Sequence, residues 1–565
     1  MKLSRIVCSM TGLALVAILA AVGPAAAQFA RVYPNPLNAK APTSMKVLKR
    51  SKVHHKASAI NDKDAIVTEG GPLKGLDVWG GDGYFGIPYA APPVGNLRWM
   101  PPQPPPKFRG VFQANSYGGF CTQPDGAGGA FGSEDCLTLD ILRPHQKKNA
   151  NTGLPVMVWF HGGGLVTGNS FFYKPVPLVL GGNVIEVNVN YRLGYLGFFA
   201  HPAIDAEGHA NGNYGLMDQQ AALQWVHRNI AAFGGDPNRV TIFGESAGGQ
   251  SIYCHLASPT AAGLFERAIS ESGAGVEFQD YWDFIVPVSQ GESLGTSLVP
   301  SGTSIAASAG CATQTASCLR GLPVETLASM EPANVFPFVD GTILTQTPTD
   351  AFTNGQFNRV PVISGGNHDE ERIFVARQYD FAGSPLVTMS DYDNALLAFW
   401  GAGFDPFVLA LYPFAGYPSA GVALAASETD GIFACPARNA ARLLSQYVTT
   451  YAYEFNDENA PDLFDPVPTF PLGAYHSAEI PYLFDLDVRF AGFNPFMPDQ
   501  QALSNTMIGY WTQFATTGDP NFAGAPTWLP YDSGTDQFQS LVPPAPMAES
   551  TFDSDHQCSS FWSAF

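Results

Sequence analysis

The sequence predicts an α/β fold built on one large, mostly parallel central sheet with helices on both faces. Continuous apolar runs at residues 155–160, 184–190 and 240–243 are typical of strands that are covered on both sides. A helical pattern at residues 215–233, with apolar side chains recurring on one face, separates the last two runs. Strands that alternate with helices in this way indicate parallel pairing.

Three segments precede these runs in the chain. Residues 65–78 alternate loosely and contain two adjacent glycines, as expected of an edge hairpin. Residues 85–93 are rich in proline and are predicted to form a turn region. Residues 137–142 alternate as a further strand.

The C-terminal half of the chain continues the pattern with longer interruptions. Further strands are predicted at residues 268–273, 359–364 and 449–455, and a last long helix at residues 501–516. The stretches 275–348 and 379–442 are broken by Gly, Ser and Pro or are helical, so they are predicted to be helices and loops inserted between strands. No internal repeat, linker or low-complexity tract divides the chain, and residues 65–565 are predicted to form one domain.

The composition limits the classes of protein to which the chain can belong. The chain has 565 residues, of which 45% are hydrophobic and only 14% charged, enough apolar material for a sizeable core. Its formal net charge is −20, which argues against nucleic acid as a partner.

The N-terminus has the features of an export signal. Lys2 and Arg5 precede a mostly apolar run at residues 6–22, and three alanines at 25–27 form a small-residue cleavage site. Residues 1–27 are therefore predicted to be a signal peptide, which makes the protein secreted or periplasmic, with no stable membrane anchor. Residues 28–64 are predicted to be a flexible extension; attachment of their basic patch to an anionic surface is the alternative.

The strand at 240–243 runs directly into the sequence Gly244-Glu245-Ser246-Ala247-Gly248 and then into a helical pattern. A strand that turns sharply into a helix through G-x-S-x-G forms a nucleophile elbow. The turn would present the Ser246 hydroxyl above the sheet and direct the Ala247 amide into the same space.

A serine hydroxyl needs a general base, usually histidine, and the histidine needs a carboxylate to hold its tautomer. When the nucleophile is carried on such an elbow, the acid and then the histidine follow it in the chain. The loops after the predicted strands at 359–364 and 449–455 are the candidate positions. The sequence His161-Gly162-Gly163-Gly164, after a buried strand, can supply backbone amides for an oxyanion.

At this point the chain resembles the type B carboxylesterases, a family that includes cholinesterases and bacterial para-nitrobenzyl esterases, and it is closest in character to secreted bacterial members. The resemblance covers about residues 67–561 and rests on the motifs FGIPYAAPPVGNLRW, EDCLTLDI, FHGGGLVTG, NVNYRLGYLGF, NYGLMDQQAALQWVHRNIAAFGGDPNRVTIFGESAGG, GGNHDEE, GAYHSAEIPYLF and WTQFATTGDPN. It implies the α/β-hydrolase fold, with helical and loop insertions around the active site.

The resemblance also implies roles for individual residues. Ser246 matches the nucleophile, His476 the base and Glu370 the acid, with His255 and His368 as rival histidines by position. The family's acid lies in a D-E-G motif, whereas the chain continues with another glutamate. Asp369 and Glu371 therefore stay open as alternatives, although a solvated acidic turn suits these two better.

Further assignments follow from the same resemblance. Gly163, Gly164 and Ala247 match the oxyanion-hole donors. Glu245 is expected to be buried beside the triad, where it either tunes the charge of the histidine and organises water or serves as a structural acid.

Eight cysteines are present, of which Cys8 lies in the predicted signal peptide, so at least one of the remaining seven is unpaired. The resemblance implies disulfides Cys121–Cys136, Cys311–Cys318 and Cys435–Cys558. It leaves Cys254 as a buried free thiol.

The resulting expectation is a serine carboxylesterase that acts through an acyl-enzyme on small-molecule esters, without cofactor or metal. The alternatives are a lipase-like or amide-cleaving specificity, and a non-catalytic binding protein on the same scaffold. A cholinesterase is disfavoured, because the loop between Cys121 and Cys136 has Phe131 but no Trp to hold a cation. The physiological ester and the oligomeric state are not predicted.

Overall fold

The computed structural model describes residues 65–145, 153–273, 285–295, 300–330, 335–403, 405–461, 468–486 and 496–562. The signal peptide and the extension predicted for residues 1–64 lie outside these ranges. Among the described residues, no helix is long and apolar enough to cross a membrane.

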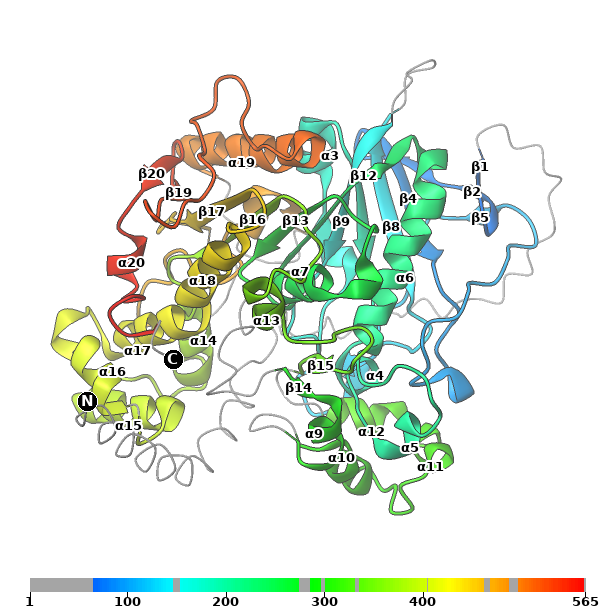
Figure 1. Cartoon of the computed structure of the whole chain (residues 1–565), viewed down its shortest axis with the longest axis horizontal. Coiled ribbons are helices and arrows are strands. Elements are labelled where there is room, and N and C mark those ends of the chain that lie inside the picture. The colour runs from blue at the N-terminus through cyan, green and yellow to red at the C-terminus, as the bar shows by residue number, and fades with distance from the viewer. Residues whose placement is uncertain are drawn as a thin grey trace, which may run out of the picture.

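An 11-stranded sheet forms the centre of the molecule (Figure 1). Its strands, in spatial order, are β20 (Met547–Glu549), β19 (Phe538–Leu541), β17 (Thr450–Phe455), β16 (Val362–Asn367), β13 (Arg267–Glu271), β12 (Gly235–Glu245), β9 (Leu154–Phe160), β11 (Ile185–Val189), β8 (Thr138–Pro144), β4 (Gly81–Pro88) and β3 (Leu76–Val78). The pairs from β19 to β11 are parallel, and antiparallel strands flank them on both edges. The predicted mostly parallel α/β fold is therefore confirmed.

The register of the central strands determines where a site can form. Glu245 at the end of β12 pairs with Glu271 of β13, which pairs with Gly365 of β16. Because parallel strands end at the same edge, the loops after these strands meet there. The residues that follow β12, β16 and β17 in the chain thus start from neighbouring positions.

Helices cover both faces of the sheet (Figure 1). On one side α3 (Val176–Gly182) packs against α19 (Pro498–Thr517); α6 (Tyr214–Asn229), α7 (Ala247–Ala257) and α18 (Cys435–Leu444) lie on the other. The two long insertions form separate helical groups. They consist of α9 (Val288–Ser293), α10 (Gly302–Ser308), α11 (Ala316–Arg320) and α12 (Val324–Ser329), and of α14 (Arg372–Val375), α15 (Met389–Trp400), α16 (Asp405–Leu411) and α17 (Ala420–Thr429).

Short elements complete the fold. They are β1 (Ile66–Thr68), β2 (Gly71–Lys74), β5 (Phe112–Gln113), β6 (Gln123–Pro124), β7 (Ala130–Phe131), β10 (Tyr173–Lys174), β14 (Val286–Pro287), β15 (Phe338–Val339), β18 (Asp485–Leu486), α4 (Gly194–Gly197), α5 (Pro202–Asp205), α13 (Pro348–Thr353) and α20 (Phe552–Asp555). The antiparallel β1–β2 pair confirms a hairpin within residues 65–78, but it belongs to a separate three-stranded sheet with β5, and of this segment only β3 lies at the edge of the central sheet.

Two regions of the fold differ from the sequence analysis or were not predicted by it. The segment predicted as a proline-rich turn begins inside β4, which runs to Pro88 and pairs with β8 across an irregularity in register after Tyr84. An edge-side strand tolerates proline where a bulge breaks the ladder. The strands β19 and β20, which the sequence analysis did not predict, extend the sheet at its other edge.

The structure contains the disulfides Cys121–Cys136, Cys311–Cys318 and Cys435–Cys558. Cys254 on α7 is a buried free thiol, and burial raises its pKa above the usual value. The longest closed loop joins α18 to the C-terminal tail across 123 residues.

Candidate active site

Ser246 occupies the turn between β12 and α7 with φ 59° and ψ −125°, a conformation that is strained for a residue with a side chain. Its amide donates to the carbonyl of Glu271, which anchors the turn on the neighbouring strand. A Cβ atom at Gly248 would lie 1.9 Å from the carbonyl oxygen of Phe160, so only glycine allows α7 to start this close to β9. The G-x-S-x-G sequence thus forms the sharp strand-to-helix turn that it predicted.

Glu370 and His476 meet at the same edge of the sheet. The Nδ1–H of His476 donates to Glu370 Oε2 at 2.5 Å, and both side chains are buried. The other oxygen, Glu370 Oε1, accepts the backbone N–H of Asn367 at 2.7 Å, and the backbone N–H of His476 donates to the carbonyl of Glu370. The carboxylate is thereby fixed between the two loops and holds one tautomer of the imidazole.

The neighbours of Glu370 point elsewhere. Asp369 pairs with Arg372 and accepts the backbone N–H of Ala474. Glu371 is completely buried beside Glu428; burial, and then the Glu371 carboxyl, raise the pKa of Glu428 well above its usual value. The expectation of a solvated turn was wrong for both, because the adjoining helices and the loop before His476 cover them.

Glu245 connects the elbow to the histidine. Its Oε1 lies 3.1 Å from His476 Nε2 and also accepts a hydrogen bond of 2.6 Å from the hydroxyl of Ser477. Nε2 of His476 is therefore next to the residue that precedes Ser246 in the chain. Glu245 is thus a buried, hydrogen-bonded acid whose carboxylate also lies beside the imidazole of the histidine.

The electrostatics of this region are dominated by buried carboxyls. Burial alone would lower the pKa of His476, but the charges of Glu245 and Glu370 outweigh it and raise that pKa to about 9. Burial in turn raises the pKa of Glu245. Burial also raises the pKa of Glu271 to about 8 and that of Glu479 well above its usual value.

The glycine run after β9 lies against the elbow. Gly163 and Gly164 have φ values of 107° and 64°, and the Gly163 carbonyl accepts the amides of Val166 and Thr167. Within the described part of the chain, no protein acceptor takes the amide hydrogen of Gly163, Gly164 or Ala247. Three unpaired donors beside a serine can stabilise a negative oxygen.

Comparison with known proteins places the chain in a family. A family model described as the carboxylesterase family matches residues 62–559. The chain belongs to the carboxylesterase family. It is 33% identical over 493 residues to an acylcarnitine hydrolase of Mus musculus, with 82% of this chain and 83% of the relative covered. It is 34% identical over 503 residues to a cocaine esterase of Homo sapiens, with 82% and 84% covered.

A solved structure agrees with this family assignment. The structure named PNB esterase superposes with a TM-score of 0.70 at 30% identity, covering 87% of this chain and 99% of its own. The α/β-hydrolase fold expected from the resemblance is thus confirmed, and as a carboxylesterase the protein is an ester hydrolase.

The two rival histidines have other environments. His255 on α7 is fully buried and bonds through Nε2 to Gln219 at 2.7 Å, and burial lowers its pKa to about 3. His368 bonds through Nδ1 to Asp369. Among the described residues, neither histidine forms a side-chain hydrogen bond with Glu370.

Sequence reasoning missed three polar residues that support the carboxylesterase site. Asn367 donates through Nδ2 to the carbonyl of Tyr475 and to Glu479 Oε2, which ties the acid loop to the histidine loop. Ser477 orients Glu245, as described above. Glu479 lies three residues after His476 in the motif GAYHSAE. Its place in this motif was the sequence signal that could have identified it.

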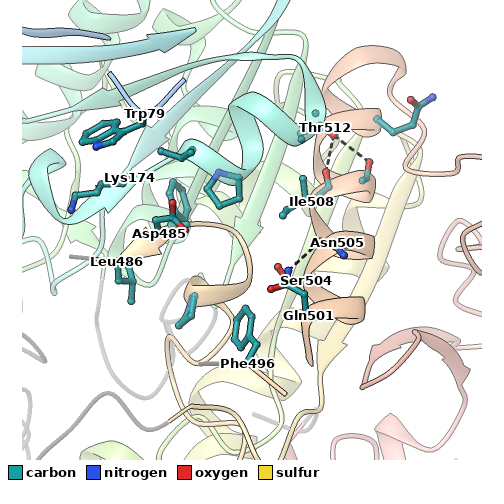
Figure 2. Close-up of a pocket in the computed structure, with 18 of the residues that line it drawn as sticks. Trp79, Lys174, Asp485, Leu486, Phe496, Gln501, Ser504, Asn505, Ile508 and Thr512 are labelled. Carbon is teal, nitrogen blue, oxygen red and sulfur yellow. Dashed lines mark hydrogen bonds between the residues drawn. The ribbon is translucent and has the colours of Figure 1, made fainter. Parts of the chain in front are cut away.

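A cavity of about 1110 Å³ lies between α3 and α19, away from these residues (Figure 2). Its walls include Trp79, Lys174 and Phe496, and none of Ser246, Glu370 and His476 lines it. This cavity is therefore separate from the candidate catalytic residues.

Proposed function

We propose that the protein is an exported serine carboxylesterase in which Ser246, His476 and Glu370 form the catalytic triad. The observation that carries the proposal is the strained Ser246 turn, adjacent in the chain to Glu245, whose side chain contacts the Glu370-bound His476. Nδ1 of the imidazole is held by Glu370, so Nε2 is the nitrogen that can accept the serine proton.

In the acylation step, Ser246 Oγ attacks the ester carbonyl carbon while His476 Nε2 takes the hydroxyl proton. The negative oxygen of the tetrahedral intermediate is bound by the amides of Gly163, Gly164 and Ala247. Each such donor is worth about 3 kcal/mol of barrier. Collapse of the intermediate breaks the bond to the alcohol, which leaves with the proton from His476.

In the deacylation step, water replaces the alcohol. His476 removes a proton from the water, whose oxygen attacks the acyl carbon, and the same amides hold the second oxyanion. The carboxylic acid leaves and the proton returns to Ser246. Glu245 and Glu370 stabilise the imidazolium that forms in each half-reaction.

Export is part of the proposal. The N-terminal sequence at 1–27 has the pattern of a signal peptide, and three disulfides are typical of oxidising compartments. Residues 65–565 would then be the catalytic domain, preceded by the extension at 28–64.

Labelling with a fluorophosphonate tests the triad. The adduct is expected on Ser246, and Ser246→Ala is expected to lose both the label and the hydrolysis of p-nitrophenyl acetate. Ser329→Ala, which changes an exposed serine, is the matched control. A label on another residue refutes the assignment, and a folded wild-type protein without turnover on any short ester favours a non-catalytic binding protein.

The relatives carry names as different as acylcarnitine hydrolase, cocaine esterase and bile salt-activated lipase, so the substrate must be measured. Turnover of p-nitrophenyl esters of increasing acyl length, together with one matched anilide, separates a short-chain esterase from lipase-like or amide-cleaving specificity.

A further inference from the structure

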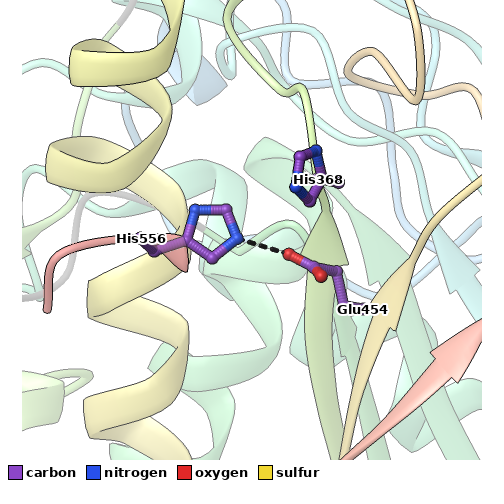
Figure 3. Close-up of side chains that lie close together, drawn as sticks. All are labelled: His368, Glu454 and His556. Carbon is purple, nitrogen blue, oxygen red and sulfur yellow. Dashed lines mark hydrogen bonds and ion pairs between the residues drawn. The ribbon is translucent and has the colours of Figure 1, made fainter. Parts of the chain in front are cut away.

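A second group of side chains with metal-binding chemistry lies beside the proposed triad (Figure 3). His368 directly follows β16, Glu454 is on β17 and His556 directly follows α20. One possible ligand atom from each lies within 4.8 Å of the other two. Three distant segments of the chain therefore place two imidazoles and one carboxylate around one point.

The outer nitrogen of each histidine is already held by a carboxylate. Nδ1 of His368 lies 3.0 Å from Asp369 Oδ1, and Nδ1 of His556 lies 2.5 Å from Asp430 Oδ1. This leaves Nε2 of each ring as the possible ligand. Metal-binding histidines almost always donate their other N–H to a carboxylate, which fixes the tautomer and the direction of the ring.

The carboxylate of the group is oriented in the same way. Glu454 Oε1 lies 2.5 Å from His556 Nε2, while Glu454 Oε2 accepts a hydrogen bond of 2.9 Å from Asn456 Nδ2. The same amide nitrogen contacts Glu549 Oε2 at 3.3 Å. One oxygen of Glu454 is thus held in place and the other faces the histidines.

We propose that His368, Glu454 and His556 bind a divalent transition-metal ion, for which zinc fits best. Two imidazole nitrogens and one carboxylate oxygen are a ligand set that zinc accepts at about 2.0–2.2 Å, with a water or a fourth side chain completing a tetrahedron. Such bonds place neighbouring ligand atoms about 3.3 Å apart. The metal ion takes the place of the proton between His556 and Glu454, and these two side chains move slightly apart. The His368 ring moves toward the metal ion.

Access and charge are consistent with an ion entering from solvent. The His368 side chain is 36% exposed, whereas those of His556 and Glu454 are 3% and 2% exposed. Among the described residues no protein group bonds to Nε2 of His368. The carboxylates of Glu454, Asp430 and Asp369 surround the point, and a dication compensates their charge.

The site would join the tail to the loop that carries the proposed acid. His556 lies two residues before Cys558, and Asp369 lies between His368 and Glu370 in the chain and accepts the amide of Ala474 in the histidine loop. Within the described part of the chain, none of the three ligands forms a hydrogen bond or ion pair with His476. The expected role is therefore structural, and metal binding is measurable without substrate and independently of the triad.

The test uses the full mature chain without a histidine tag, treated with a chelator and then dialysed against Zn²⁺. Elemental analysis is expected to find one zinc per chain, and Co²⁺ is expected to give the visible bands of a four-coordinate site. His368→Gln changes the exposed ligand and should fold, as judged by circular dichroism. It is expected to weaken zinc binding more than about 100-fold, because loss of an outer partner alone costs 10–100-fold.

His145→Gln is the matched control, since this exposed histidine also lies against two carboxylates, Asp77 and Asp82. It should bind zinc like the wild type, and zinc should raise the melting temperature of both but not that of His368→Gln. The proposal is overturned if the wild type retains no stoichiometric zinc, which would leave the group a hydrogen-bonded ion-pair network. It is also overturned if His368→Gln binds zinc as tightly as His145→Gln.

Discussion

Replacing Glu245 with glutamine would test how the proposed base is tuned. The substitution keeps the size of the side chain and an oxygen that can accept the hydroxyl of Ser477 at 2.6 Å. It removes the negative charge that lies 3.1 Å from His476 Nε2. The imidazolium then loses one of its two close carboxylates, so the pKa of His476 must fall.

The size of the fall is bounded by the structure. Although burial disfavours the imidazolium, Glu245, Glu370 and Glu371 raise the pKa of His476 from 6.5 to about 9. Their combined effect exceeds the rise from 6.5 to about 9, which corresponds to roughly 3 kcal/mol. Glu245 is the charge that raises the pKa of His476 most, so its removal lowers this pKa toward its usual value.

The assay is the pH dependence of kcat/KM on p-nitrophenyl acetate, whose acidic limb reports the base of the free enzyme. The base must be neutral to accept a proton, so a lower pKa moves the acidic limb of Glu245→Gln to lower pH. Glu325→Gln is the control, because it removes an exposed carboxylate on α12, a helix that carries none of the proposed catalytic residues. A limb that stays in place or moves to higher pH in Glu245→Gln would refute the reasoning.

Further predictions concern the acid, the oxyanion hole and the tail. Glu370→Gln should lower kcat about 10⁴-fold by releasing the histidine tautomer; a loss under tenfold would exclude Glu370 as the acid. Gly163→Ala places a Cβ 2.3 Å from the carbonyl oxygen of Thr167 at φ 107°, so the loop must move and kcat should fall about 10²–10³-fold, with little change if Gly163 is not a donor. Replacing Cys435 and Cys558 by alanine opens a 123-residue loop and should lower the free energy of unfolding, measured in urea, by about 5 kcal/mol; an unchanged free energy would contradict this role of the disulfide.

The central sheet could be predicted from sequence because its strands are covered on both faces. Residues 155–160 and 184–190 had to be nearly all apolar, and they form β9 and β11. The tail strands β19 and β20 lack this signal, since they are short and mix polar with apolar residues at an edge. Pro88 suggested a turn because proline is rare inside strands. It is tolerated in β4 because the pairing with β8 is irregular after Tyr84.

The candidate site also has parts that the sequence could predict and parts that it could not. Ser246 and the glycines of its turn carry a local backbone signature, so a single sequence predicts their geometry. The contact between Glu245 and His476 joins residues separated by more than two hundred positions, and only the fold reveals it. His368, Glu454 and His556 also lie far apart in the chain, and no spacing rule for metal ligands detects such a group.

The choice of Glu370 as the acid can now be argued from hydrogen bonding instead of from the incomplete D-E-G motif. Glu271 and Glu479 are also buried nearby, yet each leaves one carboxyl oxygen without a donor within the described residues. An oxygen without a donor suits a protonated carboxyl, in agreement with the raised pKa values of both groups. Both oxygens of Glu370 accept hydrogen bonds, one from Asn367 and one from Nδ1 of His476. Glu370 is therefore the carboxyl that can hold the imidazole, while its neighbours along the chain bind other partners.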